Sequence, residues 1–97
     1  MRIIVRRTLR EFWEKHRDAE EALRGWFKEV SKAKWENFNE LKQDFPSASI
    51  LRNNRVVFDI KGNKYRLIAR INFPYKIIWI RFIGTHAEYD KIDASNI

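Results

Sequence analysis

The sequence predicts an α+β fold in which two to three helices come first and cover one face of a mostly antiparallel sheet of four to five strands, followed by a short helix at the carboxyl end. Two observations lead to this prediction. Apolar residues recur with helical spacing up to about residue 45, whereas after residue 48 they alternate with a period of two. Short segments with glycine, asparagine or proline separate the later apolar runs and indicate hairpin turns. The other face of the sheet would then be free for a ligand.

The first element expected is a strand. Residues 1–5 are short, β-branched and flanked by charge, which is typical of a strand within a sheet. Thr8 followed by Glu11 forms a capping-box pair. From Leu9 to His16 apolar and aromatic residues then recur at helical spacing, so we expect a short amphipathic helix there.

Two further helices are expected before the sheet continues. Asp18 and Glu21 repeat the capping pattern, and an apolar stripe follows over three turns. Asn37 provides a third cap for a helix of one or two turns, which Pro46 ends.

Four strands account for the second half of the chain. We expect them at residues 48–51, 55–61, 64–71 and 77–84. The pair Gly62-Asn63 suits a two-residue primed turn, because both residues tolerate positive φ. In the third of these strands Tyr65, Leu67, Ala69 and Ile71 would face the core, and Lys64, Arg66, Ile68 and Arg70 would face the other way.

Length and composition restrict the class of protein. The 97 residues predict one domain, residues 1–97, because two cores would each be too small to offset chain entropy. No apolar run is long enough for a membrane span or a secretory signal, so we expect a cytoplasmic protein. With no cysteine and only two histidines, the chain predicts neither disulfides nor a bound metal or other cofactor.

The positive charge is concentrated in the strands. The chain has 20 basic and 13 acidic residues, and the segment Arg52 to Arg81 has eight basic residues against one acidic residue, Asp59. Side chains from adjacent strands can converge, so we expect a cationic patch on the free face of the sheet. Such a patch favours a polyanion, most often nucleic acid. A basic surface that serves only solubility is the alternative. The expected patch consists of Lys61, Lys64, Arg66, Arg70 and Arg81.

A histidine and a tyrosine lie three residues apart after the last strand. Thr85 can cap a short helix, with Glu88 at the box position, so that His86 and Tyr89 point the same way. An imidazole can move a proton near neutral pH, and a phenol can orient a phosphate oxygen. With nearby guanidinium groups, these are the parts that metal-free RNA cleavage requires. His86 as a helix-cap residue and Tyr89 as an apolar anchor are the alternatives.

The remaining aromatic residues are interpreted mainly as core. His16 ends a helical stripe, and this position predicts a packing or capping role for it. Trp79 is expected in the core, whereas Tyr75 is left open between packing and base stacking. Three tryptophans on helical apolar faces are also predicted to be core: Trp13, Trp26 and Trp35.

Two segments carry a specific pattern: FDIKGNKYRLIARINF, residues 58–73, and FIGTHAEYDKID, residues 82–93. Together with RIIVRRTL near the amino end and FPSASIL in the middle, they resemble the HigB-type toxins of bacterial toxin–antitoxin pairs over nearly the full length. That family is similar in fold to the RelE-like ribonucleases. The resemblance therefore implies two helices set against an antiparallel sheet.

The resemblance also implies a function. It is that of an mRNA interferase, an endoribonuclease that cuts mRNA without a metal, inhibits translation and is neutralised by a HigA-like antitoxin with a helix-turn-helix domain. Operator DNA would be bound only by the toxin–antitoxin complex. Arg66 and Arg81 would stabilise phosphate and transition-state charge, His86 would transfer a proton, and Tyr89 would orient or assist. The RNA backbone would be bound by Lys61, Asn63, Lys64, Arg70 and Lys76.

Two other functions remain open at this point. The same basic face could belong to a nucleic-acid-binding module without catalytic activity, or it could recognise an acidic segment of the antitoxin. Whether cleavage depends on the ribosome, and whether the antitoxin covers the site, are also left open.

Overall fold

The computed structural model describes residues 1–97 as nine helices and strands with one short 3₁₀ turn. In chain order they are β1 (Arg2–Ile4), α1 (Arg6–Lys15), the 3₁₀ turn η1 (Arg17–Ala19), α2 (Glu20–Lys32), α3 (Phe38–Asp44), β2 (Ser49–Ile50), β3 (Arg55–Ile60), β4 (Tyr65–Asn72), β5 (Ile77–Thr85) and α4 (His86–Tyr89).

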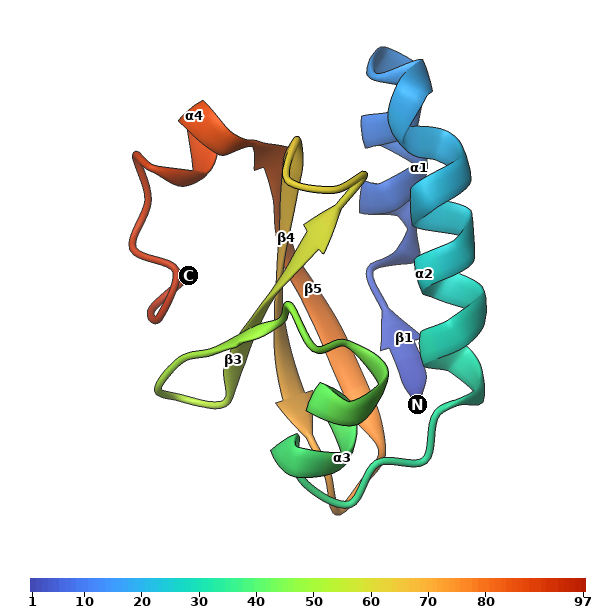
Figure 1. The fold of residues 1–97 in the computed structure, drawn as a ribbon, viewed down its shortest axis with the longest axis vertical. Coiled ribbons are helices and arrows are strands. Elements are labelled where there is room, and N and C mark those ends of the chain that lie inside the picture. Colours follow the sequence, from blue (N-terminus) through green and yellow to red (C-terminus); the bar gives the residue numbers. More distant parts are fainter.

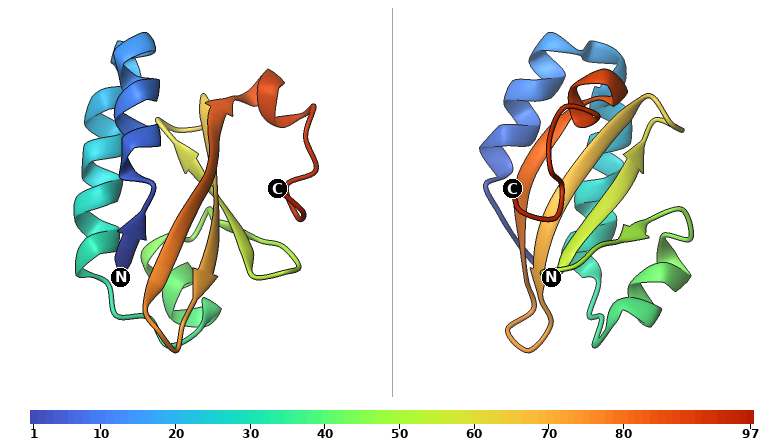
Figure 2. Two further views of the ribbon diagram at one scale, coloured as in Figure 1. Left: turned by 180° about the vertical axis from the view of Figure 1, so that it is seen from behind. Right: turned by 90° about the vertical axis from the view of Figure 1, so that its left-hand side faces the viewer.

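The strands form one five-stranded sheet in the order β1-β5-β4-β3-β2. β1 runs parallel to β5, and every other pair is antiparallel. Helices α1 and α2 cover one face of this sheet, and the segment after α4 passes across the opposite face (Figures 1 and 2). The α+β prediction, with helices first and a mostly antiparallel sheet, is confirmed.

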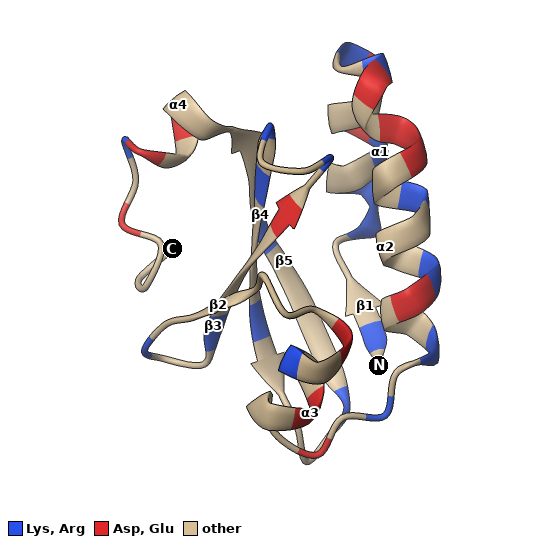
Figure 3. Cartoon of the chain, in the orientation of Figure 1, with Lys and Arg blue, Asp and Glu red and all other residues tan.

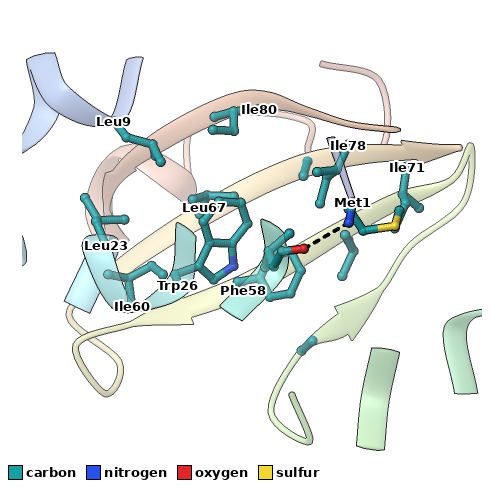
Figure 4. Close-up of a cluster of buried hydrophobic side chains, with 14 of the residues drawn as sticks. Met1, Leu9, Leu23, Trp26, Phe58, Ile60, Leu67, Ile71, Ile78 and Ile80 are labelled. Carbon is teal, nitrogen blue, oxygen red and sulfur yellow. Dashed lines mark hydrogen bonds between the residues drawn. The ribbon is translucent and has the colours of Figure 1, made fainter. Parts of the chain in front are cut away.

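The main core lies between the helices and the sheet. Leu9 of α1 and Leu23 and Trp26 of α2 are buried against β-strand residues such as Phe58 and Leu67 (Figure 4). The alternation predicted for the strands holds on this face, because Tyr65, Leu67, Ala69 and Ile71 are all buried in this cluster. The Met1 amine donates to the carbonyl of Val30 at 3.2 Å and so ties the start of β1 to the end of α2.

Of the three helix caps predicted before the second half of the chain, one is correct. Asn37 caps α3 as expected, because its side chain accepts from the backbone N–H of Glu40 at 3.0 Å. The predicted cap at Thr8 is wrong, since α1 begins at Arg6 and follows Val5, which has φ 70° and no capping side chain. The predicted cap at Asp18 is also wrong.

Asp18 connects η1 with the start of β4 instead. Its carboxylate accepts hydrogen bonds from Lys64 and from the Tyr65 hydroxyl, the latter at 2.6 Å. These two hydrogen bonds, with that from Lys64 the stronger influence, lower the pKa of Asp18 to about 2, and contact with Asp18 raises the pKa of Lys64 and of Tyr65. Lys64 therefore binds a carboxylate on the helix side of the sheet. The strand alternation had predicted that Lys64 would share the face of Arg66, and that prediction is wrong.

The turn between β3 and β4 is close to the prediction. The N–H of Lys64 donates to the carbonyl of Lys61 at 3.3 Å, so Gly62 and Asn63 are the central residues. The positive φ values occur at Lys61 and Gly62, however, and not at Asn63.

A bulge interrupts the pairing of β4 with β5. Ile68 lies opposite Phe82 but Ala69 lies opposite Ile80, so Arg81 is the extra residue. The bulge lets Ile80 face the helices while Phe82 faces the opposite side of the sheet.

The sequence had suggested that the face opposite the helices would be free, but part of this face is covered. Val57, Ile68 and Ala94 are buried in a second small cluster there, with partly buried neighbours that include Ile92 and Ile97. Residues 90–97 thus lie over the middle of this face (Figure 2). Ile68, which was predicted to share the open face with Arg66 and Arg70, is fully buried beneath this segment.

Candidate active site

Arg66 is positioned by the register of three strands. It lies opposite Asp59 of β3 and opposite Gly84 of β5, on the face away from α1 and α2. Its Nε is 3.0 Å from Oδ1 of Asp59, and its side chain is 19% exposed. The Nε–H does not point well at that oxygen, so the contact is an ion pair and leaves the buried Nε without an aligned acceptor.

The Arg66 guanidinium also meets two loop and helix residues. Its Nη2 is 3.0 Å from Oδ1 of Asn63 and 3.1 Å from Nε2 of His86. The guanidinium carbon lies 5.1 Å from the centre of the Tyr89 ring, within cation–π distance. Nη1 has no acceptor in the protein and is available to a ligand oxygen.

The contact with Arg66 determines the tautomer of His86. A guanidinium only donates hydrogen bonds, so Nε2 of His86 must accept with its lone pair. The ring proton then resides on Nδ1, which is 3.3 Å from Oδ2 of Asp90 and donates to it. His86 therefore lies between a cation on its Nε2 side and a carboxylate on its Nδ1 side.

The short helix α4 holds His86 and Tyr89 in place. Thr85 accepts from the backbone N–H of Glu88 at 3.2 Å, and the Glu88 carboxylate accepts from the N–H of Thr85 at 2.8 Å, which completes the predicted capping box. Hydrogen bonds from the backbone and then the side chain of Thr85 lower the pKa of Glu88. Because β5 leads directly into α4, the sheet itself aims these side chains toward Arg66.

The structure brings together only part of the predicted set. Asn63, Arg66, His86 and Tyr89 form one group, named here the Arg66–His86 site. Arg81 makes no hydrogen bond or cation–π contact with this group; its Nε lies 3.4 Å from an oxygen of Ile97 instead.

The remaining predicted cations lie elsewhere. Lys76 lies in the β4–β5 turn, where it donates to the carbonyl of Trp35 and is 3.1 Å from Glu36. Lys61 is exposed in the β3–β4 turn, near enough to influence Asp18. Arg70 is exposed on β4 and lies over Trp79.

The aromatic predictions had mixed outcomes. Trp26 and Trp35 are buried core residues, and His16 stacks on Phe12 with ring centroids 4.3 Å apart, which is the packing role expected. Trp79 is only partly buried and lies on the sheet face away from the helices, so its placement in the core is wrong. Tyr75 is 77% exposed.

The Arg66–His86 site is open to solvent and does not lie in a closed cavity. A hollow of about 250 Å³ lies nearby on the helix side, lined by α1 and by residues that include His16 and Glu88. No three side chains of the types that bind metals are grouped anywhere in the structure. None of the helices, the longest of which has 13 residues, has the length and apolar character of a bilayer span.

One partner within the site was missed from the sequence. Asp59 was identified only as the single acidic residue of a basic segment. Its contact with Arg66 follows from the hairpin register: a turn centred on Gly62 and Asn63 places Ile60 opposite Tyr65, and hence Asp59 opposite Arg66. The turn signal was therefore sufficient to find this ion pair.

Comparison with known proteins gives a consistent result. The family model described as HigB toxin, RelE-like toxic component of a toxin–antitoxin system, matches residues 19–92. The chain is 32% identical to the mRNA interferase HigB of Escherichia coli O6:H1 over 94 residues, which cover 95% of this chain and 91% of that protein. It is 28% identical to the mRNA interferase toxin HigB of Escherichia coli K12 over 96 residues, covering 97% and 92% of the two chains.

Proposed function

This chain belongs to the HigB family of RelE-like toxins, and from that premise we propose that it is an mRNA interferase whose active site is the Arg66–His86 site. The observation that carries this proposal is the 3.1 Å contact between Nη2 of Arg66 and Nε2 of His86. A proton acceptor and a phosphate-binding cation lie side by side there. RNA cleavage through the 2′-hydroxyl needs both groups at one phosphate.

The reaction can be written with these side chains alone. A phosphate oxygen binds the free Nη1 of Arg66, and the guanidinium turns from His86 toward the phosphate. The lone pair on Nε2 of His86 is then free to take the proton of the 2′-hydroxyl. The 2′-oxygen bonds to phosphorus, and the bond from phosphorus to the 5′-oxygen breaks. The products are a 2′,3′-cyclic phosphate and a 5′-hydroxyl, whose proton comes from the Tyr89 hydroxyl or from water.

Each remaining member of the site has a positioning role in this scheme. Asp59 holds Arg66 in the sheet, and Asp90 fixes the ring orientation of His86 and stabilises the imidazolium formed during the reaction. Arg66 meets the charge that develops on the phosphorane, and its ion pair with Asp59 keeps the guanidinium near the reacting phosphate. The step as written requires no metal ion.

RNA binding beside the reacting phosphate is assigned to the predicted residues nearest to it. Asn63 contacts Arg66 directly, and Lys61 lies in the same turn. Lys64 and Lys76 stay in the proposal as weaker contributors, because each already has a carboxylate partner within the protein.

A toxin of this family has an antitoxin partner, and we assign this role to a HigA-like protein with a helix-turn-helix domain. Neutralisation by that partner, inhibition of translation and binding of operator DNA only through the complex belong to the same proposal. Action on mRNA, free or on the ribosome, would place the protein in the cytoplasm. What supports these points is the family match and the names of the relatives.

A purified protein can distinguish cleavage from binding alone. The wild type, an Arg66→Ala, His86→Ala double variant and an Arg10→Ala control are incubated with single-stranded RNA in the presence of EDTA. Arg10 is an exposed cation of α1 without an ion pair, so its removal matches a loss of charge away from the site. We expect cyclic-phosphate products from the wild type and the control, and none from the double variant.

The same three proteins can be expressed without antitoxin in growing cells. Growth arrest by the wild type and the control, but not by the double variant, would agree with the proposal. Equal arrest by all three would show that these side chains do not carry the toxicity, and RNA binding without cleavage would favour the non-catalytic module.

A further inference from the structure

Asp18 and Tyr65 join the helix layer to the end of the sheet that carries the Arg66–His86 site. The Tyr65 hydroxyl donates to Oδ1 of Asp18 at 2.6 Å, and the Lys64 ammonium binds the other carboxylate oxygen. Asp18 lies in η1, whereas Lys64 ends the β3–β4 turn, whose basic positions are blue in Figure 3. No step of the proposed reaction uses this contact.

The Tyr65 side chain is enclosed on the helix side of the sheet. Only 3% of the residue is exposed. Its ring lies edge-on to the rings of Phe12 and His16, at centroid distances of 5.2 and 5.5 Å. Its hydroxyl donates to Asp18, and a buried phenol that keeps its hydrogen bond has little freedom to move. We name Phe12, His16, Asp18 and Tyr65 the helix-side anchor.

Tyr65 is adjacent to both halves of the Arg66–His86 site. It immediately precedes Arg66 in β4, and successive side chains of a strand point to opposite faces, so Tyr65 lies behind Arg66. Tyr65 also pairs with Thr85 of β5, which caps α4 and immediately precedes His86. One strand pair therefore leads to the guanidinium on one side and to the imidazole on the other.

The short helix α4 reaches the same residues of the helix layer. Glu88, whose carboxylate completes the capping box of α4, lines one hollow together with Phe12 and His16. The Tyr65 ring contacts those same two side chains. The end of α1 therefore gives β4 and α4 a common support, which fixes the two elements relative to each other.

The hydrogen bond from Tyr65 is the stronger of the two contacts that Asp18 makes with the hairpin. The side chains of Lys64 and Asp18 are 58% and 34% exposed, and exposed ion pairs contribute little because water and salt screen them. The Tyr65 hydroxyl bond is partly buried and has a charged acceptor, which strengthens it. Without it, packing against Phe12 and His16 alone would hold the Tyr65 ring.

We propose that Asp18 and Tyr65 are positioning residues that hold the Arg66 guanidinium against the His86 imidazole from the helix side of the sheet. This inference rests on the proposed function, since it concerns the geometry of the same site. Both residues act through the backbone of β4 and β5 and not by contact with RNA. Cleavage is sensitive to this geometry, because a displacement of about 1 Å can cost ~10²-fold in rate.

The test compares variants that break the Asp18–Tyr65 hydrogen bond with variants that keep it. Tyr65→Phe and Asp18→Ala each break it. Asp18→Asn removes the same charge as Asp18→Ala but keeps an oxygen that can accept from the Tyr65 hydroxyl. Tyr75→Phe is the matched control, because it removes the same hydroxyl from a residue that is 77% exposed.

Cleavage is measured in a single turnover, at a temperature at which thermal unfolding shows every variant to be folded. We expect Tyr65→Phe and Asp18→Ala each to slow cleavage at saturating RNA about 10- to 100-fold, and Tyr65→Phe to leave the affinity for RNA unchanged within about twofold. The double variant should be no slower than either single variant, because both changes remove one interaction. Asp18→Asn and Tyr75→Phe should cleave within about threefold of the wild-type rate.

The His86 ring reports its contact with Arg66 without any need for cleavage. Its nitrogen NMR signals depend on which nitrogen holds the proton and on the guanidinium beside Nε2. They are distinguished from those of His16 because they are missing in His86→Ala. We expect these signals to shift in Tyr65→Phe and Asp18→Ala and to keep their wild-type positions in Asp18→Asn and Tyr75→Phe.

Two results would overturn the proposal. Unchanged His86 signals in Tyr65→Phe would mean that the helix-side anchor does not position the site, whether or not RNA is cleaved. A double variant whose loss is the product of the two single losses would mean that Asp18 and Tyr65 act independently. If the wild type does not cleave RNA but Tyr65→Phe shifts the His86 signals, the positioning role holds and the catalytic assignment is wrong. If the wild type cleaves RNA and Tyr65→Phe matches its rate, the reverse is true.

Discussion

Gly84 is paired with Arg66 in the sheet and lies two residues before α4. The surrounding atoms leave no room for a side chain at this position. An ideal Cβ built on Gly84 would lie 2.5 Å from Cζ and 3.0 Å from Cε2 of Phe82, and 3.1 Å from Oε1 of Glu88. A Gly84→Ala substitution must therefore displace the Phe82 ring or the Glu88 carboxylate. Neither is free to move, because Phe82 packs in the cluster under residues 90–97 and Glu88 completes the α4 capping box.

The cost can be bounded from these two contacts. Forcing an extra methyl into a packed position typically costs about 1–3 kcal/mol, and loss of a cap costs about 0.5–2 kcal/mol. We therefore expect Gly84→Ala to lower the free energy of unfolding by about 1–3 kcal/mol in urea denaturation, with an unchanged m-value. Because α4 carries His86 and Tyr89, we also expect slower RNA cleavage at saturating RNA.

Gly25 provides a matched control for the same chemical change. It is exposed in the middle of α2, and a Cβ there would have no atom within 4 Å. Gly25→Ala should therefore raise the free energy of unfolding by up to about 1 kcal/mol, since alanine favours a helix interior over glycine. The reasoning is refuted if Gly84→Ala unfolds at the same urea concentration as the wild type and cleaves RNA at the same rate.

Three further predictions follow from the described contacts. His86→Ala should slow cleavage about 10²- to 10⁴-fold at saturating RNA, measured in a single turnover, and a change below threefold would exclude proton transfer by this residue. Asp18, whose pKa falls from 3.8 to about 2 on folding, contributes stability that is present above pH 3.8 and is lost as the pH falls through 2; thermal unfolding between pH 5 and 2 should show a smaller acid loss for Asp18→Asn than for the wild type. Leu67→Ala, at a fully buried position of β4, should cost about 2–5 kcal/mol in urea denaturation, and a cost below 1 kcal/mol would mean that this part of the core is loosely packed.

Features set by neighbours in sequence were predictable. Asn37 caps α3 and Thr85 caps α4 because the cap needs only the next three residues. The same pattern failed at Asp18, because its carboxylate accepts hydrogen bonds from Lys64 and Tyr65 of the distant hairpin and does not cap the helix. Tertiary contact overrode a local preference there, and no local signal indicates when that will occur.

The candidate site was partly predictable for the same reason. Alternation along β4 placed Arg66 away from the core, and the capped α4 placed His86 beside Tyr89, but their contact depends on the pairing of β4 with β5. The bulge at Arg81 changes that pairing and was invisible to an alternating pattern. Residues 90–97 have too weak an apolar pattern to predict that they would cover Ile68.

The parallel pairing of β1 with β5 makes assembly of this protein a late event in its synthesis. Neighbouring hairpins can form β3, β4 and β5 as soon as each emerges, but residues 2–4 must wait for residues 77–79, near the far end of the chain. His86 emerges later still. A growing chain therefore has neither its finished sheet nor its paired imidazole and guanidinium until residues 77–86 have been made.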